Sequence, residues 1–88
     1  MKYELNVAAR LREAVEWRIK KMDHYYKLSS KERVSDPEVS DMHARLGDEM
    51  LGQIEAIREV SLIFGYRFSV IDASPDEGSK MSEVRRVR

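Results

Sequence analysis

The sequence predicts a mainly α-helical fold: an antiparallel hairpin of two long helices, followed by a short β-strand and a flexible tail. Two long segments place apolar side chains at helical spacing, and only a short polar segment separates them. A connection this short makes the two helices antiparallel neighbours. The 88 residues are 42% hydrophobic and 36% charged and contain no cysteine. This composition fits one small domain and excludes a disulfide scaffold, a zinc ribbon and a thiol nucleophile.

The first helix is predicted over about residues 7–28, with Asn6 as its N-cap. No Gly or Pro interrupts this segment. At about 100° per residue its apolar side chains form one stripe. The stripe consists of Val7, Ala8, Leu11, Val15, Ile19, Met22, Tyr25 and Tyr26. The polar segment that follows this helix loses the helical period and is predicted to be a loop.

The second helix is predicted over about residues 37–64. Its start is indicated by Ser35 and Glu38, which have capping-box spacing, or by Asp36 as the N-cap with Pro37 at the first helical position. Gly65 is a predicted left-handed C-cap. The predicted core face consists of Val39, Met42, Leu46, Met50, Ile54, Ile57, Val60 and Phe64. Gly47 and Gly52 lie within this helix, where glycine is unfavourable. They either allow another backbone segment to approach closely or are simply tolerated.

A short strand is predicted over about residues 66–71, where polar and apolar residues alternate. Residues 2–6 alternate as well. They either extend the first helix or pair with residues 66–71, which would give a β-α-α-β arrangement. Residues 1–72 are therefore predicted to form the helical hairpin domain. The composition of the remaining segment, residues 73–88, predicts a flexible C-terminal tail.

A candidate partner-binding surface lies on the first helix, opposite its apolar stripe. Its centre is Trp17, and its members are Arg10, Trp17, Lys21, His24 and Leu28. Tryptophan and arginine are enriched at the energetic centres of protein interfaces. An aromatic residue among cations also suits single-stranded nucleic acid. A third interpretation has Trp17 packed against the loop or the tail of the same chain.

Two further sets of residues are candidates for contacts. The second helix carries a sparser apolar stripe, which suits either self-association or coverage by residues 66–71. This stripe consists of Ala44, Leu51 and Leu62. The C-terminus carries basic residues that suit an acidic partner, contacts with phosphate groups, or a solubilising end. These are Arg85, Arg86 and Arg88.

The search for catalytic or metal-binding motifs gives little. The sequence has only two histidines, His24 and His43, and it has no phosphate loop, nucleophile elbow or H-E-x-x-H motif. His43 lies on the predicted core face and is predicted to be a hydrogen-bonded core or interface residue rather than a metal ligand. The pair Arg18 and His24 resembles the R-x4–6-H spacing of HEPN-type ribonucleases, a family with a larger helical bundle. We therefore predict that the protein is not an enzyme and that it uses no cofactor and no metal ion.

The predicted function is that of a small protein-binding module, an inhibitor, adaptor or regulator of a larger protein. Small accessory proteins of bacterial viruses and mobile elements resemble this chain in composition, including those that block a host system. The alternative is a nucleic-acid-binding helical dimer, because residues 1–35 carry nine basic and five acidic residues. The net charge of zero disfavours that alternative. Apolar runs no longer than Leu62-Ile63-Phe64 predict no membrane span, and the expected location is cytoplasmic.

Overall fold

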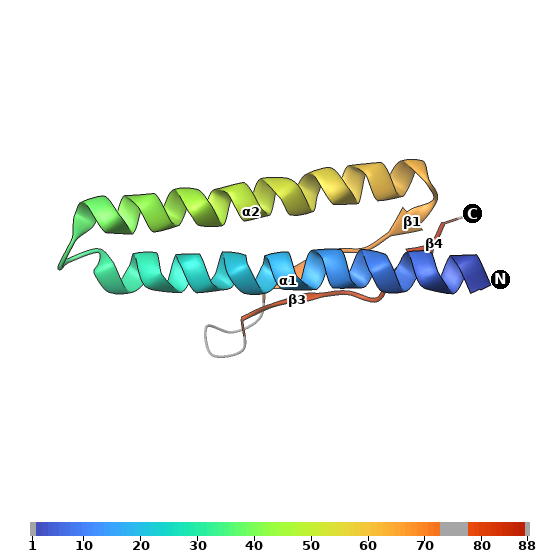
Figure 1. Ribbon diagram of the computed structural model, residues 1–88, viewed down its shortest axis with the longest axis horizontal. Helices are drawn as coiled ribbons and strands as arrows, with labels where there is room; N and C mark the ends of the chain where they lie inside the picture. Colours follow the sequence, from blue (N-terminus) through green and yellow to red (C-terminus); the bar gives the residue numbers. More distant parts are fainter. Residues whose placement is uncertain (1, 73–77, 88) are drawn as a thin grey trace.

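The computed structural model describes residues 2–72 and 78–87. Two long helices, α1 (Lys2–Glu32) and α2 (Pro37–Ile63), lie side by side and antiparallel (Figure 1). Four short strands follow, in the order β1 (Tyr66–Arg67), β2 (Val70–Asp72), β3 (Ser79–Met81) and β4 (Arg85–Arg86). The strands run along one face of the helix pair, behind it in the view of Figure 1. The predicted helical hairpin is confirmed.

Helix α1 is longer than the sequence predicts at both ends. It begins at Lys2, so residues 2–6 are helical and Asn6 lies inside the helix. Their alternative prediction as a strand paired with residues 66–71 is wrong, because β1 and β2 pair with β4 and β3 instead. At its other end α1 continues to Glu32, whose carbonyl accepts a 2.8 Å hydrogen bond from the Asp36 backbone N–H. This bond closes the turn into α2.

Both ends of α2 agree with local sequence signals. Asp36 is the N-cap, since its side-chain Oδ1 accepts a 3.3 Å hydrogen bond from the Val39 backbone N–H, and Pro37 occupies the first helical position. At the other end Gly65 has φ +88°, a conformation that favours glycine, and its N–H donates to the Leu62 carbonyl at 3.0 Å. The Asp36 interpretation and the predicted Gly65 cap are confirmed.

The hydrophobic core lies along the seam between the helices and is closed from the strand side. Its buried apolar residues are Val15, Ile19, Met22, Ile54 and Phe68. The buried residues of α2 recur every seven positions, as expected for two helices that coil around each other. They are Ser40, Gly47, Ile54 and Ser61. Most of them are small, so α1 approaches α2 closely along this row.

This close seam explains why part of the predicted core of α2 is wrong. Met42 and Val60 are each 51% exposed, and Phe64 is 74% exposed. The prediction followed the largest apolar side chains at helical spacing. The actual contact line follows small residues instead, such as Gly47, and it turns these three side chains away from α1. Val7 of the predicted α1 stripe is 44% exposed.

The four strands form one antiparallel ribbon with a local irregularity. Tyr66 and Arg67 pair with Arg86 and Arg85, whereas residues 70–72 pair with residues 79–81. Two residues separate the paired positions on one side of the ribbon and three on the other, which is the geometry of a β-bulge. Two hydrogen bonds close the irregular part. The Ser82 N–H donates to the Ser69 carbonyl at 2.8 Å, and the Ser69 N–H donates to Ser82 Oγ at 2.7 Å.

The prediction of a flexible tail over residues 73–88 is therefore wrong for residues 78–87, while residues 73–77 and 88 lie outside the described residues. The returning segment is held by backbone pairing and by α1. Asp23 accepts hydrogen bonds from the Ser79 N–H at 2.7 Å and the Ser79 hydroxyl at 3.0 Å. Arg12 donates to the Ser82 carbonyl at 3.1 Å. Apolar Met81 and Val84 also pack against the core.

The two glycines inside α2 have different surroundings. We therefore expect substitution by alanine to change the stability of the protein in opposite directions at the two positions. A Cβ at Gly47 would lie 2.6 Å from Cε1 of the Tyr26 ring, whereas a Cβ at Gly52 would meet nothing within 4 Å. Gly52→Ala should stabilise the protein by about 0.5–1 kcal/mol, the usual helix-propensity difference. Gly47→Ala should instead destabilise it, because displacing a packed ring costs about 1–3 kcal/mol.

Urea unfolding followed by far-UV circular dichroism measures both changes, and Gly52→Ala serves as the matched control. The two variants gain the same helix propensity, so the difference between them isolates the contact with Tyr26. Equal stabilisation by both substitutions would contradict the close approach at Gly47.

Candidate interaction surfaces

The predicted partner-binding residues form a continuous edge of α1, which we call the Trp17 surface. Its members, which lie three, four or seven residues apart along the helix, are Arg10, Trp17, Lys21, His24 and Leu28. Trp17 is 46% exposed. Arg10, Lys21 and His24 are exposed and Leu28 is half-buried. Thus Trp17 does not pack under the loop or the strands, which was the third interpretation of this residue.

The tryptophan side chain is held in place by its neighbour in sequence. The Arg18 guanidinium carbon lies 4.3 Å from the centre of the Trp17 ring. Arg18 is itself fixed, because its Nη1 donates to the Ala14 carbonyl at 2.7 Å and its Nε donates to Gln53 Oε1 of α2 at 2.8 Å. Sequence analysis did not assign Arg18 to this surface, because its partner Gln53 comes from the other helix.

Beside Trp17 the surface is hollowed. This shallow hollow is lined by Ala9, Arg12, Glu13, Glu16, Trp17 and Lys20. Within it Arg12 and Glu16 form an ion pair with an Nη1 to Oε1 distance of 3.2 Å. Trp17 therefore stands between a hollow of mixed charge on one side and exposed cations on the other.

The second predicted stripe, on α2, lies on the side of the hairpin that carries the strands. Leu51 lines a hollow together with Ile54, Val70 and Ser79, among others. Ala44 is half-buried, while Leu51 and Leu62 are 37% and 45% exposed. The structure thus places the centre of this stripe beside β2 and β3, and it leaves Leu51 and Leu62 exposed rather than covered by residues 66–71.

The basic C-terminal residues meet another arginine across the ribbon. Arg67 of β1 lies directly opposite Arg85 of β4, and both side chains are exposed. Arg86 lies opposite Tyr66, and Arg88 is outside the described residues. Like charges at directly opposite positions repel, so this end of the ribbon has a local excess of positive charge. Sequence analysis missed Arg67 because the pairing of β1 with β4 was not predicted.

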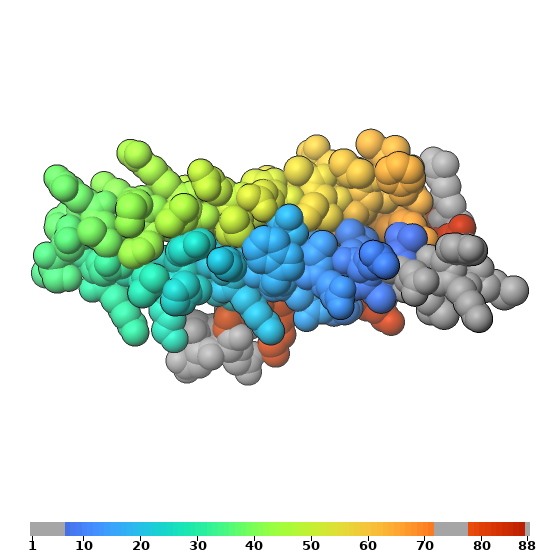
Figure 2. All heavy atoms as spheres, in the orientation of Figure 1, coloured from blue at the N-terminus to red at the C-terminus, as the bar shows by residue number. Residues whose placement is uncertain are grey.

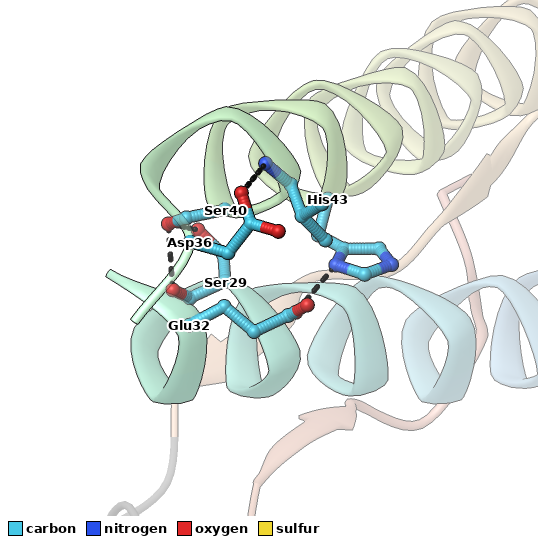
Figure 3. A network of polar contacts seen from close by, with 6 residues as sticks. Ser29, Glu32, Asp36, Ser40 and His43 are labelled. Carbon is cyan, nitrogen blue, oxygen red and sulfur yellow. Dashed lines mark hydrogen bonds and ion pairs between the residues drawn. The ribbon is translucent and has the colours of Figure 1, made fainter. Parts of the chain in front are cut away.

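A polar cluster joins the two helices next to the turn (Figure 3). His43 Nδ1 lies 2.6 Å from Glu32 Oε1, and the His43 ring stacks on the Tyr25 ring with the centres 6.2 Å apart. One turn away, the Ser40 hydroxyl donates to the Ser29 carbonyl at 2.7 Å. His43 is therefore a hydrogen-bonded interface residue, as predicted.

Tyr26 makes a second polar contact between the helices. Its hydroxyl donates a 2.6 Å hydrogen bond to Asp48 Oδ1. Burial, followed by this hydrogen bond and by the negative charge of Asp48, raises the pKa of Tyr26 to about 12 from the usual 10. The folded protein therefore holds the phenolic proton more tightly than the unfolded chain does.

This shift predicts a loss of stability in alkaline solution. The contribution of Tyr26 is fully present below pH 10 and is lost as the pH rises from 10 to about 12, because only the unfolded chain ionises readily in that range. Unfolding midpoints measured across this window should fall more steeply for the native protein than for Tyr26→Phe. Parallel curves for the two proteins would show that Tyr26 ionises equally in both states.

The structure also describes the HEPN-like pair, the grouping of metal-ligating side chains and the character of the two helices. Arg18 is bonded to Gln53 of α2, while His24, six positions later on α1, is exposed on the Trp17 surface. Among the residues that the structure describes, no group of three or more His, Cys, Asp or Glu side chains is placed to hold a metal ion. Neither α1 nor α2, as far as they are described, has the length and apolarity needed to cross a membrane.

Comparisons with protein-family models, curated proteins and solved structures found no match.

Proposed function

We propose that this protein is a non-enzymatic binding module that attaches to a larger protein through the Trp17 surface. The observation that carries the proposal is the 46% exposure of Trp17 in the middle of a long helix. Tryptophan offers a large apolar area with few rotatable bonds, which is why it is enriched among residues that dominate binding energy. The stacked Arg18 reduces its freedom further, so little conformational entropy remains to be lost on binding.

The charges around Trp17 indicate the chemistry of the partner. Arg10 and Lys21 are exposed on the same edge of α1. A partner that accepts Trp17 in an apolar pocket and surrounds that pocket with carboxylates would complement this surface. Charges at the rim of an interface mainly raise the association rate and select the partner. Binding of this kind suits an inhibitor, adaptor or regulator that acts in the cytoplasm, including an accessory protein of a bacterial virus directed at a host system.

The test is affinity capture from a lysate of source cells with the tagged protein, with and without nuclease treatment. Trp17→Ala is compared with Phe64→Ala, since Phe64 is a more exposed aromatic residue, 74% exposed, at the end of α2. A true partner should remain bound after nuclease treatment and should lose affinity about thirty-fold with Trp17→Ala, as expected for an interface residue worth about 2 kcal/mol. Phe64→Ala should leave the affinity unchanged.

Two results would contradict the proposal. Equal loss of the partner in both variants would show that exposed aromatic side chains are retained non-specifically. Recovery that disappears with nuclease, and that weakens in Arg10→Ala and Lys21→Ala, would assign the same surface to nucleic acid.

A further inference from the structure

The two broad faces of the helix pair differ in what covers them. The strands lie on one face, where Ser79 donates to Asp23 of α1, and where Val70 and Ser79 line a hollow together with Leu51 of α2. The opposite face is turned toward the viewer in Figure 2, and along the described residues it is formed by the two helices alone. Arg18 is six positions from Arg12 and five from Asp23, the two residues of α1 that bond the strand segment, so its contact with Gln53 lies on the side of the seam away from the strands. We call it the uncovered helical face.

Helical periodicity assigns further residues to this face, three, four, seven or more positions from Arg18 and Gln53. They are Val7, Leu11, Ala14 and Lys21 on α1, with Val39, Met42, Leu46, Glu49 and Val60 on α2. Val7, Met42 and Val60 are 44%, 51% and 51% exposed. The apolar side chains that the core prediction wrongly assigned to the seam thus lie largely on this face. An apolar face of this extent is a candidate interface.

We propose that a second copy of this chain packs on the uncovered helical face to form a four-helix bundle. The two-fold axis runs along the length of the hairpin, so that α1 of each copy lies on α2 of the other. This face borders the Trp17 surface and shares Lys21 with it, so the test below measures dimerisation itself rather than binding to a larger protein.

Charge complementarity selects both the occupant and the axis. Helix α1 contains eight Lys or Arg residues and five Asp or Glu residues, whereas α2 contains two and six. A two-fold axis along the hairpin places α1 of each copy against α2 of the other. Each of these two contacts then joins a helix with a net charge of +3 to a helix with a net charge of −4. An axis across the hairpin would instead place α1 on α1 and α2 on α2, which brings like charges together. Like-charge juxtaposition suppresses such an arrangement.

This axis predicts a specific ion pair. Rotation about an axis parallel to the hairpin leaves the position of each residue along the hairpin unchanged. Within one copy Arg18 lies level with Gln53, and Tyr26 lies level with Asp48. Lys21 therefore lies at about the height of Glu49, and in the dimer it faces Glu49 of the second copy. Both side chains are exposed, and neither forms an ion pair with another described residue.

The available area is sufficient for a specific dimer. The molecule extends 52 by 22 Å in this view, so the rectangle that encloses the face has an area of about 1,100 Å². A standard protein interface buries about 800 Å² on each partner. Four-helix bundles formed from two helical hairpins also bury apolar stripes of this kind.

The test combines sedimentation equilibrium with charge reversal. At low salt the native protein should reach twice the 10.3 kDa chain mass as its concentration rises. Lys21→Glu and Glu49→Lys should each weaken the dimer about ten-fold, and the double variant should restore it, since two opposite charges again meet at each contact. Lys27→Glu and Glu55→Lys are matched controls, because they make the same changes away from this face. Circular dichroism verifies that each variant is folded.

A substitution at an apolar position provides an independent measurement. Met42→Glu should abolish dimerisation while leaving the helix content unchanged, because Met42 is half exposed in the single copy. The proposal is overturned if the native protein stays monomeric up to about 1 mM, the concentration range of weak association. It is also overturned if a dimer forms that neither the charge reversals nor Met42→Glu weaken, since that dimer would use another face.

Discussion

Phe68→Ala is expected to destabilise the protein by about 3–5 kcal/mol, the range measured for the removal of a buried aromatic side chain. Phe68 is 2% exposed and is the one residue of the described strand region that belongs to the fully buried core. It links the ribbon to the seam between α1 and α2. Its removal leaves a cavity where the two layers meet and weakens the attachment of both strand pairs.

The measurement is urea unfolding, together with amide hydrogen exchange of the strand residues. Ile71→Ala is the matched control, because Ile71 lies in β2, three residues after Phe68, and is 55% exposed. Substitutions at such exposed positions usually change stability by less than about 0.5 kcal/mol. In Phe68→Ala the amides of β2 and β3 should exchange faster than those at the centre of α1. A loss of stability in Phe68→Ala as small as that in Ile71→Ala would show that the ribbon contributes little to the fold.

The parts of the fold that the sequence predicted correctly depend on local signals. The N-cap at Asp36 and the left-handed turn at Gly65 each require only a few neighbouring residues. The strand ribbon beyond residue 72 depends on contacts between distant segments, such as Asp23 with Ser79. Its apolar residues Met81 and Val84 are too sparse for a periodic pattern. Ser74, Pro75, Asp76 and Gly78 are residue types that favour turns, and they were the available sequence signal for a returning strand.

The same distinction applies to the surfaces. The exposure of Trp17 followed from periodicity alone, because a position opposite the apolar stripe of a helix faces outward. The contact of Arg18 with Gln53 and the opposition of Arg67 and Arg85 could not be predicted, because each joins two elements whose register was unknown. The exposed position of Met42 likewise depends on how closely α1 packs against the small residues of α2.

Ile54→Ala is the second substitution with a large expected effect, because of its position in the buried row of α2. The other three members of that row are Ser40, Gly47 and Ser61, so Ile54 supplies nearly all of its apolar volume. Ile54 is 1% exposed. Its truncation should cost about 2–5 kcal/mol, through lost transfer free energy and the cavity that remains. This is a large share of the roughly 5–15 kcal/mol that stabilises a typical protein.

Graded variants at this position separate cavity formation from a change in helix propensity. Ile54→Val should cost only about 0.5–1.5 kcal/mol. Leu62→Ala, at a position 45% exposed on the same helix, should cost less than Ile54→Ala by more than 1 kcal/mol. Alanine favours the helix more than isoleucine does, so any loss at position 54 must arise from packing. A loss no larger than that of Leu62→Ala would mean that α1 closes over the shortened side chain, as the small residues elsewhere in the row would allow.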